Sequence, residues 1–189
     1  MVAQQWKLEA VAKLIEGRVI DDADRVEVCI KGTVLGFPVT IEAFRAGFPF
    51  GVTFFLETAD LSQGAPPDDP NALNMMFYPR MTRGIYSFFA RLLLLEAKGQ
   101  PIDEPRVKSN FHCSYNSREL AERFVHHPGV LENLLKLEHY AKFSELTVRT
   151  NAGLSLSLST AFNNLDVEIA KQTCQAMGEL GQIIFENFQ

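Results

Sequence analysis

The stretch VEVCIKGTVLGFPVTIEAFRAGFPFGVTFFLET, residues 26–58, contains three successive runs in which apolar side chains occupy every second position. The runs are centred near Val28, Ile41 and Phe54, and they are separated by Gly-Phe-Pro and Ala-Gly-Phe-Pro. A period of two places alternate side chains on opposite faces of a strand. The stretch therefore predicts an antiparallel meander with one buried face.

A second hairpin is expected near the other end of the chain, in SELTVRTNAGLSLSLST, residues 144–160. Residues 151–153, Asn-Ala-Gly, suit a tight connection because Asn and Gly tolerate positive φ. Ser155, Ser157 and Ser159 occupy every second position after it. This spacing indicates a sheet with one wet face.

Helical spacing of apolar residues predicts helices on both sides of these strands. Gly17 is expected to end the first helix in a left-handed C-cap. The helix expected over residues 82–98 is apolar over more than one face, which is typical of a helix that is buried on two sides or forms an interface. The expected helices are residues 4–16, 82–98, 117–127, 129–142 and 163–188.

Proline-rich stretches indicate where regular structure stops. Residues 59–80 have no clear period and are expected to form a long loop. Residues 99–109 are expected to form a linker because Pro101 and Pro105 block continuation of the preceding helix.

The overall expectation is an α+β fold, with two antiparallel sheets or one bent sheet covered by helices. The linker divides the chain into residues 1–98 and 110–189, although one compact domain is an open alternative. TIEAF (residues 40–44) and LSTAF (158–162) are similar, so the two halves are either related by duplication or alike by chance.

Composition restricts the classes of function. The chain has 189 residues, of which 47% are hydrophobic and 22% charged, and its net charge is −5. These are ordinary values for a globular protein. Because no basic run appears, the chain lacks the charge pattern of a nucleic-acid-binding protein, and we expect no nucleic-acid partner.

Cysteine usage and apolar runs address the cellular location. Cys29, Cys113 and Cys174 are odd in number and far apart, which argues against a disulfide framework and fits a reducing compartment. The N-terminal segment lacks the apolar core of a signal peptide. The most apolar run, residues 85–95, is shorter than the roughly 20 residues of a transmembrane helix. We therefore expect a soluble cytoplasmic protein, with membrane association disfavoured.

The stretch HCSYNSRE, residues 112–119, looks most like catalytic chemistry. Cys113 and His112 would form a nucleophile and its base, but consecutive strand residues point to opposite faces. We expect Cys113 to point inward and His112 outward. Asn116 is expected to be the N-cap of the following helix, with Glu119 completing a capping box.

Other motifs give no cofactor or metal site. The histidines lack ligand spacing, and residues 32–37, GTVLGF, lack a phosphate-binding pattern. Gly178 and Gly181 lie inside an expected helix, where each costs about 1 kcal/mol relative to Ala. They indicate close packing within the chain or, alternatively, a dimer interface.

The strongest binding candidate is the Met- and Phe-rich segment from residue 75 to residue 95, because Met and aromatic side chains are common at binding surfaces. Its alternative is plain core. We favour a non-catalytic binding or regulatory domain, with a homodimer or a protein partner; an enzyme with a site of dispersed residues and a peripheral membrane protein are the alternatives. The candidate binding residues are Met75, Met76, Phe77, Tyr78, Arg80 and Arg83.

Two pieces of the chain, residues 32–42 and 111–138, resemble bacterial domains of unknown function. In those domains a strand enters a helix pair and a hairpin follows. The resemblance implies an α+β fold, and it transfers no site residues.

Overall fold

The structure is a computed structural model, and its described residues are 2–20, 26–44, 51–58, 72–80, 102–158 and 164–188. The helix expected over residues 82–98, which includes Arg83, lies outside them.

The expected α+β class is confirmed. The helices are α1 (Val2–Leu14), α3 (Pro105–Asn110), α4 (Arg118–Val125), α5 (Val130–Ala141) and α6 (Val167–Asn187). The strands are β1 (Arg18–Ile20), β2 (Val26–Val34), β3 (Phe37–Phe44), β4 (Val52–Glu57), β5 (Asn74–Pro79), β6 (Phe111–Tyr115), β7 (Glu145–Arg149) and β8 (Gly153–Leu158).

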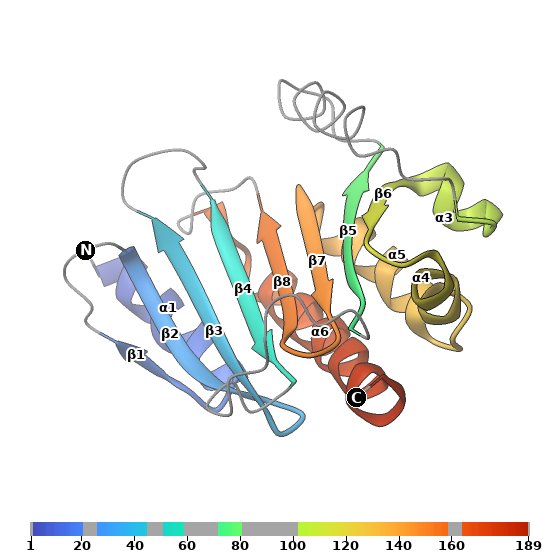
Figure 1. Ribbon diagram of the computed structural model, residues 1–189. Coiled ribbons are helices and arrows are strands. Elements are labelled where there is room, and N and C mark those ends of the chain that lie inside the picture. The colour runs from blue at the N-terminus through green and yellow to red at the C-terminus, as the bar shows by residue number, and fades with distance from the viewer. Residues whose placement is uncertain are drawn as a thin grey trace.

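All of these strands belong to one antiparallel sheet of eight strands in the order β1-β2-β3-β4-β8-β7-β5-β6 (Figure 1). The hairpin β7–β8 is inserted between β4 and β5. Strands from before and after residues 99–109 therefore alternate within one sheet. The strands before and after this segment do not repeat a common order, so the structure gives no support to a duplication.

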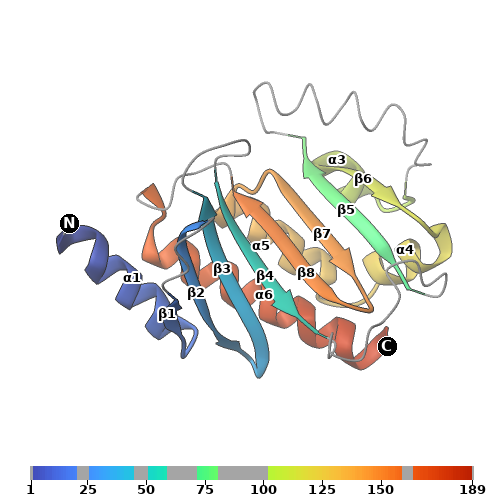
Figure 2. The same cartoon turned by 60° about the vertical axis from the view of Figure 1, so that its left-hand side comes forward.

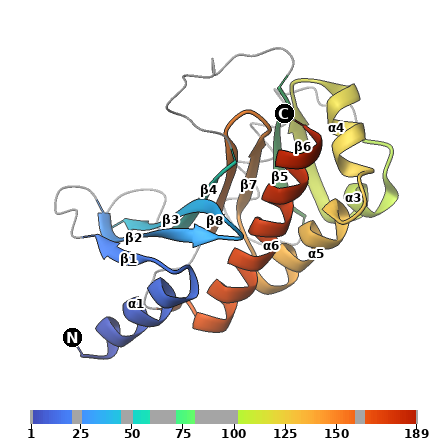
Figure 3. The ribbon, with the colours of Figure 1, turned by 90° about the horizontal axis from the view of Figure 1, so that it is seen from below.

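Helices cover one face of the sheet. α1, α5 and α6 lie together on that side, and α3 and α4 pack at the end of the sheet formed by β6 (Figures 2 and 3). The opposite face carries no helix from the described part of the chain (Figure 3). Each helix of the described residues is too short or too polar to cross a membrane.

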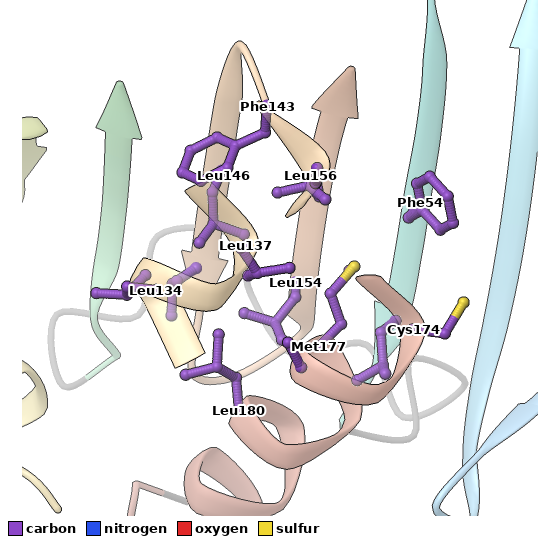
Figure 4. Close-up of a cluster of buried hydrophobic side chains, with 14 of the residues drawn as sticks. Phe54, Leu134, Leu137, Phe143, Leu146, Leu154, Leu156, Cys174, Met177 and Leu180 are labelled. Carbon is purple, nitrogen blue, oxygen red and sulfur yellow. The ribbon is translucent and has the colours of Figure 1, made fainter. Parts of the chain in front are cut away.

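The core follows directly from the alternation of apolar residues in the strands. One row of side chains crosses the sheet on the helix-covered face, because directly opposed residues of antiparallel strands share a face. α5 and α6 add a second layer, in which Leu137, Met177 and Leu180 belong to the same hydrophobic cluster as this row (Figure 4). Each such side chain contributes about 1.5–3 kcal/mol by burial. The row is Ile30, Ile41, Phe54, Leu156, Leu146 and Phe77.

Two expectations about proline-containing stretches are wrong. Residues 74–79, expected in a loop, form the strand β5. Residues 105–109, expected in a linker, belong to α3, and Pro105 occupies its first turn. Proline is favoured there because the first helical N–H groups have no partner inside the helix. The Glu104 side chain caps this helix by accepting the Arg106 N–H at 3.1 Å.

The expected left-handed cap at Gly17 is also wrong, because the preceding residue adopts that conformation. Glu16 has a φ of 49°. The Gly17 N–H donates to the Ala12 carbonyl at 2.8 Å and the Glu16 N–H to the Lys13 carbonyl at 3.3 Å, the paired bonds of a Schellman motif. Gly17 is needed for another reason, since a Cβ there would overlap the backbone of Lys31.

The N-cap of α4 is Ser117, and the expectation of Asn116 is wrong by one residue. The Ser117 Oγ accepts the Leu120 N–H at 3.4 Å. Asn116 instead joins neighbouring chain segments: its Nδ2 donates to the Ala72 carbonyl at 2.8 Å and its Oδ1 accepts the Asn74 N–H at 2.9 Å. Its side chain holds the start of β5 against the end of β6.

The two glycines of α6 are explained by close packing inside the chain. A Cβ at Gly178 would lie 2.7 Å from a methyl group of Val34, and one at Gly181 would lie 2.6 Å from a methyl group of Leu56. Small residues at these positions let α6 approach the sheet closely. Of the two interpretations, intramolecular packing is the one that these contacts support.

Candidate functional site

The uncovered face of the sheet contains a hollow of ≈ 700 Å³, which we call the central hollow. Side chains from β2, β3, β4, β5, β7 and β8 line it. Since the strands are held by a continuous hydrogen-bonded ladder, the positions of these side chains are set by the register of the sheet.

One row of outward side chains crosses the middle of the hollow. Each residue in this row is directly opposite its neighbour on the next strand, so all of them share the uncovered face. The row contains two apolar side chains, one cation and three hydroxyl groups. In strand order it is Lys31, Thr40, Phe55, Ser155, Thr147 and Met76.

The floor of the hollow is β8, whose outward positions hold small residues. Gly153 and Ser155 lie between the longer side chains of β4 and β7. Gly153 has a φ of 143°, and a Cβ there would overlap the carbonyl oxygen of Leu56. Only glycine therefore fits this position without displacing β4.

Charged groups of both signs line the hollow. They are Lys31, Arg149, Glu42, Glu57 and Glu145. The first four form no ion pair with another described residue. A surface with these free charges attracts polar ligands of complementary charge.

Glu145 differs from the other acids because it has partners. Its carboxylate accepts the Thr147 hydroxyl at 3.2 Å. Burial, followed by the negative charge and hydrogen bonding of Glu145, raises the pKa of Tyr78 to about 12. Tyr78 is therefore a neutral hydrogen-bonding group at neutral pH, beside the end of the hollow nearest to Glu145.

The sheet separates the candidate binding residues of the Met- and Phe-rich segment. Met76 lines the central hollow, and Tyr78 points to the same face. Met75 and Phe77 are fully buried on the helix-covered face. Arg80 is exposed just after β5, where its Nε donates to the Phe111 carbonyl at 3.2 Å.

The structure also places the two residues that resembled a nucleophile and its base. Cys113 is opposite Phe77 and faces the core, whereas His112 is opposite Tyr78 on the other face, as expected from the alternation. Burial raises the pKa of the Cys113 thiol to about 12. The thiol is protonated at neutral pH, and thiolate chemistry has no support here.

The charged residues of the hollow were not among the sequence-based candidates. The alternating serines of β8 indicated a wet face, and they correctly identified the side of the hairpin that forms the floor. The convergence of Phe55, Ser155 and Met76 depends on pairing of β4 with β8 and of β7 with β5, for which the sequence pattern carries no signal.

The arrangement offers hydrogen-bonding hydroxyl groups, two apolar contacts and fixed charges. In the described part of the chain, no group of three or more His, Cys, Asp or Glu residues is placed to hold a metal ion.

Comparison with known proteins finds no matching family model, no matching curated protein and no matching solved structure.

Proposed function

We propose that this protein is a non-catalytic binding domain whose ligand occupies the central hollow. The observation that supports this most directly is the hollow itself, since its ≈ 700 Å³ falls within the roughly 300–1,000 Å³ of small-molecule sites. Such sites combine apolar walls with a few polar groups that orient the ligand. Here Phe55 and Met76 are the apolar contacts, and Thr40, Thr147 and Ser155 supply hydroxyl groups.

A fragment screen monitored by two-dimensional amide NMR spectra tests this proposal. We expect the amide signals that shift on fragment binding to come from the residues lining the hollow. Replacement Ser155→Phe fills the floor and should weaken binding at least about tenfold, because the ligand would clash with the ring. Ser114→Phe is the matched control, since Ser114 is opposite Met76 on the same face but does not line the hollow.

Shifts that cluster elsewhere, or equal affinity in both variants, would rule out the hollow as the binding site. Chemical conversion of a bound compound would show that the protein is an enzyme and not a non-catalytic binding domain. The homodimer stays a prediction, and peripheral membrane association stays the disfavoured alternative. Light scattering with size exclusion measures the first, and liposome flotation measures the second.

A further inference from the structure

Two opposite charges stand on either side of Gly153. Glu57 on β4 is directly opposite Gly153, and Gly153 is directly opposite Arg149 on β7. Two strand spacings separate Glu57 from Arg149, or about 10 Å between their backbones. Neither side chain forms an ion pair with any residue of the described ranges.

Each of the two charged side chains, Glu57 and Arg149, forms a small binding subsite together with a neighbouring side chain. Phe55 precedes Glu57 by two residues, so both point to the uncovered face, and both line the hollow. A carboxylate beside an aromatic ring suits an ammonium group. Asn74 is directly opposite Arg149. A guanidinium beside a side-chain amide suits a carboxylate, which accepts hydrogen bonds from both.

The bare backbone of Gly153 leaves the space between the subsites open, and the Ser155 hydroxyl borders it. A ligand that reaches both charges needs a body about 10 Å long, which corresponds to roughly three residues of extended peptide at about 3.3 Å each. An anion alone or a cation alone would leave one of the two protein charges without a partner. A polyanion would also meet the carboxylates of Glu42 and Glu57.

Building on the binding function proposed above, we infer that the central hollow takes a short zwitterionic ligand of the tripeptide class. Its ammonium group lies against Glu57 and Phe55, and its carboxylate lies against Arg149 and Asn74. The apolar part of the ligand lies over the floor of β8, toward Met76.

The test combines ligand capping with charge neutralisation. The probes are the tripeptide Gly-Phe-Gly with free ends, its N-acetylated form, its C-amide and the doubly capped form, titrated by NMR at pH 7. Each cap should weaken binding to the native protein about tenfold, the effect of losing one charge-assisted hydrogen bond. Glu57→Gln should remove the acetylation effect alone, and Arg149→Gln the amidation effect alone.

Glu119→Gln and Arg106→Gln are matched controls, because these exposed residues lie on α4 and α3 and do not line the hollow. Both should keep both capping effects. Equal binding of all four peptides would contradict the inference that the ligand is zwitterionic, but it would leave the proposed binding function intact. Failure of every peptide to bind, with fragments still bound in the hollow, would overturn this inference alone. Failure of fragments and peptides together would overturn both proposals.

Discussion

At the scale of single residues, Glu16 shows a local cost that the fold tolerates. It is exposed and has a φ of 49°. The left-handed conformation costs an L-residue about 1–2 kcal/mol, whereas glycine instead loses more backbone entropy on folding, about 0.5–1 kcal/mol. The Schellman bonds of Glu16 and Gly17 use only backbone atoms, so a glycine at position 16 keeps them.

We therefore expect Glu16→Gly to raise the free energy of unfolding by about 0.5–1 kcal/mol, measured by urea denaturation. Lys13→Gly is the control, because Lys13 is exposed within α1, where glycine costs about 1 kcal/mol relative to alanine. Loss of stability in both variants would show that the conformation of Glu16 is not strained.

Gly153 combines an unusual φ with a close contact, and Gly36 separates the two effects. Gly36 has a φ of 85°, and a Cβ there would meet nothing within 4 Å. Gly36→Ala should cost about 0.5–1 kcal/mol of unfolding free energy, because the strain of the left-handed conformation is partly offset by the smaller backbone entropy that alanine loses on folding. Gly153→Ala should cost about 3 kcal/mol or more, since the added Cβ also overlaps the Leu56 carbonyl. Equal losses in denaturant titrations would refute a role for the contact between β8 and β4.

At the scale of elements, Asn116 is the side chain that fixes the edge of the sheet. It makes hydrogen bonds to Ala72 and Asn74, whereas Ser117 makes one long bond to the backbone of α4. We expect Asn116→Ala to lower the free energy of unfolding by about 1–2 kcal/mol, and Ser117→Ala by about 0.5–1 kcal/mol.

Amide hydrogen exchange distinguishes the two variants by location. Asn116→Ala should speed exchange of the amides that pair β5 with β6, while Ser117→Ala should speed exchange in the first turn of α4. Faster exchange of the α4 amides in the Asn116 variant would instead indicate that Asn116 is the N-cap of this helix.

The strand β5 was missed in the sequence for a physical reason. Met75 and Phe77 point into the core, but their outward neighbours Met76 and Tyr78 are also largely apolar, so no alternation of polarity appears. An outward face of this kind arises because Met76 lines the hollow. The apolar outward residues made the segment a candidate binding surface, and they also removed the alternation that would have predicted a strand.

At the scale of the whole molecule, local patterns predicted the elements better than their arrangement. The meander and the β7–β8 hairpin follow from alternation and turn residues close in the chain. The pairing of Phe55 with Ser155 joins segments about 100 residues apart. Because nothing in either segment specifies the other, the class of fold was predictable, whereas the choice between one sheet and two, and the central hollow, were not.

The layered arrangement also makes the stability of the molecule sensitive to alkaline pH. Cys113 and Cys174 lie on the helix-covered side, and burial raises the pKa of each thiol from 9.0 to about 12. Above pH 9 the unfolded chain releases these protons while the folded chain keeps them. The free energy of unfolding therefore falls as the pH rises from about 9, and the fall levels off near pH 12.

Each thiol should contribute a loss of about 1.4 kcal/mol between pH 7 and pH 10. The double variant Cys113→Ala/Cys174→Ala is expected to be less stable at pH 7, because both side chains leave cavities. Its loss between pH 7 and pH 10 should nevertheless be smaller than that of the native chain by about 2–3 kcal/mol. Urea titrations under reducing conditions measure both curves, with Cys29 and the partly buried Tyr78 common to the two proteins. Parallel curves would mean that water reaches both thiols in the folded state and that the helix layer does not seal this face of the sheet.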